Sequence, residues 1–471
     1  MRPILWLLLF ILVGLSGGMI AELPIASYWV SWSTSVFIYL FTVTGVLIEI
    51  PKDLPILRQL FRPYFLGFTF FSGYVPLSTI FYFLSLFGYE FFTQTNDQSP
   101  SLVELNLVVS AQWYYLIAQV FYVIGMAAWK WKTENRKYNL PTVAVSDIFL
   151  VFFLLIQVLV FLSVLIPGFA QVAVKLSSIS QILGVLFLGV SIEEGKRTKI
   201  LIGTGLVIYS FLIALFSGMK SAPLLVAILL STFLIYRYPR TITFFSLAAF
   251  FIWVTYIPYY NGTYRDLAWG QFVDPIEANQ IAREETLNAS PQALQNASWA
   301  MLVDRLSEVN MFIKFSGNVP QNRPYYGMEI LSQVFIGIIP RVFWPEKPDM
   351  EILIMTRVYE NGVVVETSDV SAKPSYVADS YLTGGWPVII IAHFLLGFFN
   401  IWLANKAENW FGGYLFGSGV IFNGLFSIAW LGNSFEFLVN SMFWSFVVMA
   451  ALRLGFIWAG VLRPNRTESD T

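Results

Sequence analysis

Twelve runs of about 20 mostly apolar residues dominate this chain and constrain its fold more than any other feature. A helix needs about 20 such residues to cross the hydrocarbon core of a bilayer. Composition agrees, because 12% of the 471 residues are charged, whereas a soluble domain carries roughly 25%. The sequence therefore predicts an all-α, polytopic membrane protein with about 12 transmembrane helices, at 4–20, 28–50, 64–88, 107–129, 143–167, 172–192, 200–217, 222–236, 241–259, 386–404, 412–430 and 434–460.

The scarcity of certain residue types excludes several kinds of chemistry. The chain has no cysteine, which excludes disulfides, thiolate catalysis and cysteine-ligated metals. It has one histidine, which argues against a histidine-based metal site. Its net charge of -1 argues against a nucleic-acid partner. We therefore expect no metal, no cofactor and no nucleic acid, with the lipid bilayer as the main surroundings.

Lysine and arginine collect in alternate loops between the predicted spans. Cytoplasmic loops of membrane proteins carry the excess of these two residues. If Arg2 is placed inside, 16 of the 28 Lys and Arg residues fall in cytoplasmic segments, whereas the external loop 89–106 has three acids and no cation. Both termini are then cytoplasmic. The long polar stretch 260–385 is external, which in a bacterium is the periplasmic side of the inner membrane.

The polar stretch divides the chain into three parts, which are nine spans in 1–259, a large external loop in 260–385, and three spans with a short tail in 386–471. The loop holds 9 Lys/Arg and 15 Asp/Glu, and it keeps aromatic residues throughout. Apolar residues recur in it at three- and four-residue spacing. This pattern predicts helices from Asp274 to Gly317, with a break near Ser290, and from Glu329 to Ile339, where Pro340 ends the helix.

Isolated cations lie where the predicted spans meet the outer face. An ionisable side chain at membrane depth costs roughly 2.5–3.5 kcal/mol, so such residues usually mark function. Guanidinium groups bind phosphate in a bidentate manner, and ammonium groups act as point charges. Several cations facing the outer leaflet suit a pyrophosphate ligand. The candidates are Lys175, Lys220, Arg265, Arg305, Arg341 and Lys347.

Three short motifs accompany the large external loop. They are the hairpin Ser217-Gly218-Met219-Lys220, the proline-rich string from Pro340 to Pro348, and the segment from Ala378 to Pro387 that leads into the tenth span. Together they resemble the O-antigen (oligosaccharide repeat unit) polymerases, the Wzy-type family. The resemblance implies a glycosyltransferase C-like fold and a metal-independent transfer of a growing glycan from undecaprenyl diphosphate to a new lipid-linked unit. A chain-length regulator would be a further partner.

The resemblance also gives roles to the candidate cations. The leaving group of such a transfer is a lipid diphosphate, whose departing charge needs positioned cations. We assign this stabilising role to Arg341, Arg265 and Lys220. Arg305 and Lys347 are weaker candidates for the same role. The cations predicted to bind the substrate are Lys220, Arg305, Lys347 and Lys175.

An acceptor hydroxyl benefits from a general base within hydrogen-bond reach. We assign this role to Asp379, with Glu366 and Asp369 in reserve. The related O-antigen ligases use a histidine in the corresponding region. Here the single histidine, His393, lies inside the tenth predicted span, where we expect a buried structural role. This difference argues against a ligase and for a polymerase.

Other functions stay open at this point. A lipid-linked oligosaccharide flippase or polysaccharide transporter would suit twelve spans with interior polar residues, and Asn433, Glu436 and Asn440 share one helical face. Such transporters usually show two related halves and short external loops. This chain shows no internal repeat and one dominant loop. An O-antigen ligase, or an acyltransferase for the same glycans, is disfavoured by the lack of a loop histidine.

Overall fold

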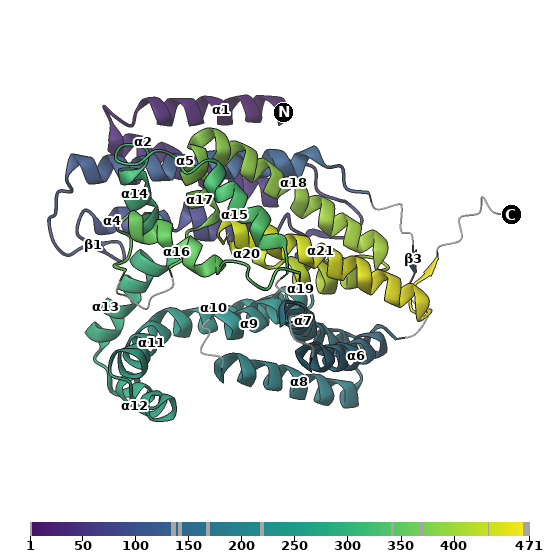
Figure 1. Ribbon diagram of the computed structural model, residues 1–471. Helices are drawn as coiled ribbons and strands as arrows, with labels where there is room; N and C mark the ends of the chain where they lie inside the picture. The colour runs from purple at the N-terminus through teal and green to yellow at the C-terminus, as the bar shows by residue number, and fades with distance from the viewer. Residues whose placement is uncertain are drawn as a thin grey trace.

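A computed structural model gives the fold and describes residues 2–132, 138–139, 144–165, 170–216, 221–340, 343–366, 372–431 and 433–464. Within these residues the architecture is almost wholly helical (Figure 1). The strands form two short antiparallel ribbons, in which β1 (Tyr89–Glu90) pairs with β2 (Thr93–Gln94) and β3 (Tyr138–Asn139) with β4 (Arg463–Pro464). The predicted all-α class is confirmed.

Helices occupy the apolar runs that precede the polar stretch. They are α1 (Arg2–Gly18), α2 (Pro24–Val43), η1 (Ile56–Arg58), α3 (Leu66–Ser72), η2 (Gly73–Leu77), α4 (Thr79–Ser85), α5 (Leu102–Ala128), α6 (Val145–Leu165), α7 (Ala170–Glu194), α8 (Arg197–Phe216), α9 (Ser221–Leu234) and α10 (Pro239–Thr255). The third predicted span is interrupted by the π turn η2. Pro76 lies inside this turn, and proline lacks the backbone donor that a regular helix requires.

The polar stretch folds into short helices, with bounds α11 (Ile257–Arg265), η3 (Asp266–Gly270), α12 (Pro275–Asn288), α13 (Pro291–Met301), η4 (Leu302–Leu306), α14 (Val309–Asn318), α15 (Met328–Ile338), α16 (Met350–Glu360) and α17 (Tyr376–Gly384). The predicted break near Ser290 is confirmed, because its hydroxyl accepts a hydrogen bond from the Ala293 N–H and starts α13. A second, unpredicted break falls at Ser307. Its backbone is extended, and its hydroxyl accepts from the Val309 N–H at 3.2 Å.

The C-terminal part consists of α18 (Trp386–Trp410), η5 (Leu415–Phe422), α19 (Asn423–Phe426), α20 (Ile428–Leu431) and α21 (Phe435–Trp458). Within the described residues, seven helices are long and apolar enough to cross a membrane. These seven are Leu66–Ser85, Leu102–Ala128, Val145–Ser163, Val172–Glu194, Pro239–Ala268, Trp386–Trp410 and Phe435–Trp458. The prediction of a helical membrane protein holds at this coarser level, and the count of twelve spans stays a prediction.

The helices α5 and α18 pack most closely where glycine faces backbone. A Cβ atom on Gly125 would overlap the backbone of Phe394, and one on Gly397 would overlap that of Tyr122. Small residues let the backbones of two membrane helices come into contact. Van der Waals packing then drives their association, because the hydrophobic effect does not favour helix–helix contacts in lipid. This pair belongs to a buried cluster that also includes residues of α2, α14 and α17. Helices α14 and α17 of the polar stretch therefore share one hydrophobic core with the apolar helices α2, α5 and α18.

Cations pack over aromatic rings near β3. In Figure 1, β1 and the helices α11 to α14 lie at the end opposite β3. At the β3 end, cations pack over aromatic rings, with Arg453 5.3 Å from the ring centroid of Tyr138 and Arg62 4.8 Å from that of Trp131. Arg62 is fully buried and also pairs with Asp53 and Glu408, so it adds no net positive charge there. Arg453 is a cation held over the ring of Tyr138 in β3.

Candidate functional site

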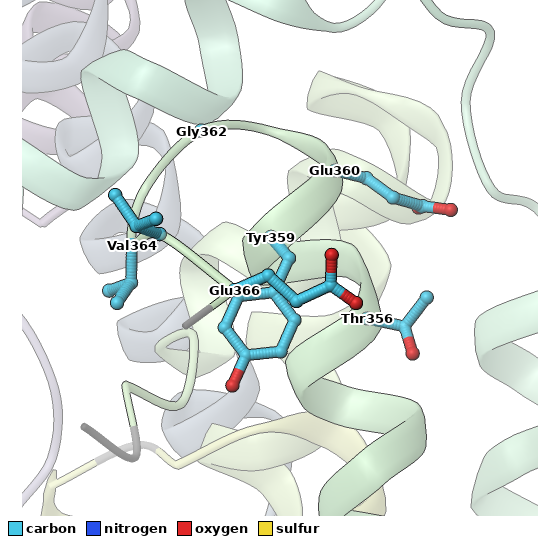
Figure 2. A pocket seen from close by; sticks show the side chains of 7 residues that line it. Thr356, Tyr359, Glu360, Gly362, Val364 and Glu366 are labelled. Carbon is cyan, nitrogen blue, oxygen red and sulfur yellow. The ribbon is translucent and has the colours of Figure 1, made fainter. Parts of the chain in front are cut away.

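A cavity of about 510 Å³ lies beside α16 and the loop that follows it (Figure 2). Asp349 starts α16 by accepting a hydrogen bond from the Glu351 N–H at 2.8 Å. After the helix ends, Gly362 turns the chain back with φ 63°, a conformation that glycine adopts without strain. The loop then faces the helix. The residues that line the cavity are Thr356, Tyr359, Glu360, Gly362, Val364, Val365 and Glu366.

Two carboxylates line this cavity, and they differ in how their charge is compensated. Glu360 is ion-paired with Arg323, and it also accepts a hydrogen bond from the Tyr326 hydroxyl at 2.9 Å. Glu366 makes no hydrogen bond or ion pair with any residue that the structure describes. In Figure 2 its carboxylate is seen between Tyr359 and Thr356. Glu366 is therefore the carboxylate that is available to a ligand in this cavity.

Behind the cavity, the opposite face of α16 carries Arg357 in a buried cluster that we call the triad, consisting of Arg357, Asp379 and Glu436. Arg357 donates two hydrogen bonds to the carboxylate of Asp379, at 3.0 and 2.8 Å. It also donates to Glu436 at 2.9 Å and to Gln333 at 3.0 Å. These partners lie on α17, α21 and α15. The triad therefore joins the helix that lines the cavity to the last apolar span.

The triad holds two carboxylates against one guanidinium, so it has one excess negative charge when all three groups are ionised. Burial raises the pKa of Asp379 to about 7; the charge of Arg357 opposes this shift, and that of Glu436 adds to it. The Phe435 N–H donates a further hydrogen bond to Asp379 at 2.9 Å. Asp379 is fully buried among these partners. Its carboxylate is engaged in holding α16, α17 and α21 together.

The three residues predicted as candidates for the general base differ in their position relative to the cavity. Asp379, the predicted base, lies in the triad and does not line the cavity. Glu366, predicted as a reserve, lines the cavity. Asp369, the other reserve, lies outside the described residues. The single histidine, His393, is buried in α18 as expected, and its Nδ1 pairs with the Ile389 carbonyl at 2.8 Å.

Among the predicted cations, Arg265 and Arg305 lie within electrostatic range of each other. Arg265 ends α11 and Arg305 lies in η4, and the charge of Arg305 acts on the guanidinium of Arg265. Two like charges within electrostatic range favour binding of an anion, because an anion relieves their repulsion. Arg341 and Lys220, the other two residues predicted to stabilise the diphosphate, lie outside the described residues.

The two remaining predicted cations contact neutral groups of the protein. Lys347 is buried, and its ammonium donates to the carbonyls of Gly337 and Ile339 at 2.8 and 2.9 Å. These carbonyls end α15, where a cation is favoured by the helix dipole. Lys175, on α7, donates to the Ser441 hydroxyl and to the Leu425 carbonyl. Both lysines thus have a structural contact in addition to the binding role predicted for them.

Arg357 was not predicted, although the sequence contains a signal for it. It shares one face of α16 with Ile354, Val358 and Asn361, at three- and four-residue spacing, and all four residues are buried. An arginine in phase with the apolar positions of a helix requires buried acceptors. Glu436 was predicted only as an interior polar residue that suits a transporter. Their pairing is a tertiary contact that spans 79 residues of sequence.

A second enclosed carboxyl group belongs to Glu308, which follows the break at Ser307. It accepts a hydrogen bond from the Tyr74 hydroxyl at 2.5 Å, at the π turn η2. Burial raises the pKa of Glu308 to about 7, although the hydroxyls of Tyr74 and Ser375 oppose this shift. No lysine or arginine among the described residues forms an ion pair with it. The contact fastens the start of α14 to the interrupted span.

Replacing Glu308 with glutamine is expected to flatten the pH dependence of stability. In the folded state the Glu308 carboxyl keeps its proton up to about pH 7. In the unfolded state a glutamate loses its proton at about pH 4.3. The folded state then holds more protons between these values, so the stability from Glu308 falls as pH rises through that window. Thermal unfolding in detergent measures this at about pH 5 and about pH 7.5, and the wild type should lose stability relative to the variant at the higher pH. A difference in stability between the two proteins that is the same at both pH values would contradict this prediction.

These features define an all-helical membrane protein whose polar middle segment carries a carboxylate-lined cavity tied to the last span by a buried triad. Among the described residues, no group of three or more His, Cys, Asp or Glu residues is placed to hold a metal ion. The chain belongs to the family described as a domain of unknown function, DUF8712, which matches residues 12–464. No curated protein and no solved structure matches the chain.

Proposed function

We propose that the protein polymerises undecaprenyl-diphosphate-linked oligosaccharide repeat units at the outer face of the bacterial inner membrane. The observation that carries this proposal is the cavity beside α16, which presents the available carboxylate of Glu366 on the segment between two sets of apolar helices. A transferase for lipid-linked sugars needs helices that contact the lipid and a polar cavity for the sugar. This chain combines long apolar helices with a polar cavity, and the triad joins them.

The distribution of charge supports an external position for the cavity. Sixteen of the 28 Lys and Arg residues fall in alternate loops of the proposed topology, and the positive-inside rule assigns these loops to the cytoplasm. Arg453, held over Tyr138 of β3, lies at the end opposite helices α11 to α14. In the proposed topology of about 12 spans, with both termini inside, the segment 260–385 then lies in the periplasm. A glycosyltransferase C-like fold and a chain-length regulator as partner belong to the same proposal.

The proposed reaction uses Glu366 as general base. Its carboxylate takes the proton of an acceptor hydroxyl, and the hydroxyl oxygen attacks the anomeric carbon of the donor sugar. The bond from that carbon to the diphosphate oxygen breaks, and undecaprenyl diphosphate leaves with the electron pair. Arg341, Arg265 and Lys220 stabilise the charge that develops on the diphosphate. The residues proposed to bind the remainder of the lipid-linked substrate are Arg305, Lys347 and Lys175.

The triad holds α16, which lines the cavity, in a fixed position. Catalytic groups act best when elements with fixed side chains hold them within a few tenths of an ångström. Arg357 lies one residue from Thr356 and two from Tyr359, which line the cavity. Because Arg357 is fixed by Asp379 and Glu436, the register of α16 against the last span is fixed as well. Asp379 thus acts on the cavity through Arg357, as a positioning residue.

Replacing Arg341 with alanine is expected to abolish long glycan chains while single repeat units are still made. The loss of one positioned cation at a leaving group typically costs about 10²–10³ in rate. Glycan chain length in cells, read on a gel, tests this. Lys373→Ala is the matched control, because Lys373 is a partly exposed cation of the same segment that pairs with Glu351 and has no proposed role in the reaction, so its glycan ladder should stay normal. A normal glycan ladder with Arg341→Ala would overturn the proposed function.

A further inference from the structure

The cavity beside α16 is rich in hydrogen-bond acceptors. Glu366 presents two carboxylate oxygens, which can only accept while ionised. The Thr356 hydroxyl donates its proton to the Ile352 carbonyl at 2.9 Å, so its oxygen faces the cavity as an acceptor. Tyr359 adds one hydroxyl and an aromatic ring. A ligand that satisfies these groups must therefore bring several donors and an apolar face.

Among the described residues, the charge of Glu366 in this cavity has no ion-pair partner. None of the seven lining residues is a lysine or arginine. Arg323 pairs with Glu360, and Lys314 donates to the carbonyl of Val363 at 3.3 Å. Glu366 lacks such a partner among the described residues. A second carboxylate brought by a ligand would meet this charge in a lining that contains no cation.

We propose that this cavity binds a sugar ring that carries no carboxylate, and that it rejects uronic acids. The hydroxyls of a neutral hexose are donors for Glu366 and Thr356, and the C–H face of the ring can pack on Tyr359. The volume of about 510 Å³ lies within the roughly 300–1,000 Å³ of small-molecule sites. The inference rests on the proposed function, because it makes the cavity the subsite for the acceptor sugar.

Binding of two sugars that differ at a single carbon tests this inference. Methyl glucoside and methyl glucuronide differ only in the group at C6, and ligand-observed NMR with the purified full-length protein measures their Kd values. We expect the glucuronide to bind at least about tenfold more weakly, which corresponds to about 1.4 kcal/mol of charge repulsion. Glu366→Gln should bring the two Kd values close together. Glu351→Gln, on the same helix but outside the lining, should leave the difference unchanged.

A measurement on the wild-type protein tests the same charge repulsion even if the Glu366→Gln variant misfolds. Raising NaCl from about 50 mM to about 500 mM should narrow the difference between the two sugars, because salt screens exposed charges. Equal or tighter binding of the glucuronide, or no binding of the glucoside, would overturn the inference. If this inference fails but Arg341→Ala still loses its glycan ladder, the proposed function is retained. If the protein discriminates between the two sugars but Arg341→Ala gives a normal glycan ladder, the proposed function is wrong.

Discussion

Replacing Arg357 with alanine is expected to destabilise the folded protein by about 3–5 kcal/mol, because the change removes the only cation of the triad. Asp379 and Glu436 would then remain buried side by side, each without its counter-charge. At least one of them must bind a proton or the four helices must separate. Unfolding in mixed micelles with an increasing fraction of denaturing detergent measures the loss.

Arg323→Ala is the matched control for Arg357→Ala. Arg323 also belongs to the middle segment and pairs with two glutamates, but its side chain is 32% exposed. Exposed ion pairs contribute about 0–1 kcal/mol, so this variant should stay close to the wild type. A triple variant with apolar residues of similar size in place of the triad should recover much of the stability. If Arg357→Ala and Arg323→Ala unfold together, the triad does not hold the helices as we infer.

The helical segments were predictable because lipid leaves the backbone few alternatives. A chain in hydrocarbon must satisfy its backbone hydrogen bonds internally, so an apolar run such as that of α5 or α18 becomes a helix. The interruptions were harder to predict. The π turn at Pro76 and the break at Ser307 depend on specific side-chain contacts, including the tertiary hydrogen bond from Tyr74 to Glu308 across 234 residues. Hydropathy contains no information about such contacts.

The candidate site was predictable only in part. Asp379 was chosen because it lies in the motif that leads into the tenth predicted span, yet its partner Arg357 comes from another helix, and only the tertiary fold reveals the pair. Glu366 was a reserve, since nothing in its neighbours indicates that the loop after Gly362 folds back onto α16. The local sequence identifies which residues carry charge. The packing decides which charges are buried against each other and which remain open to a ligand.

Replacing Glu366 with glutamine is expected to slow glycan transfer by about 10²–10⁴-fold, because an amide cannot take the proton of the acceptor hydroxyl. Glutamine keeps the size of the side chain, so the cavity beside α16 should keep its shape. Purified protein in lipid nanodiscs, supplied with lipid-linked repeat units, gives the rate of chain growth directly. Single-turnover measurements separate this chemical step from substrate binding.

Glu360→Gln is the control for Glu366→Gln, because Glu360 lines the same cavity but already pairs with Arg323. Its replacement should change the rate by no more than a few-fold. A smaller variant, Glu366→Ala, should regain part of the activity when formate is added, since formate can enter the vacated space and accept the proton in place of the side chain. Rescue by formate separates a base from a residue that only shapes the cavity. Equal losses in Glu360→Gln and Glu366→Gln, or no rescue of Glu366→Ala, would remove Glu366 from this role.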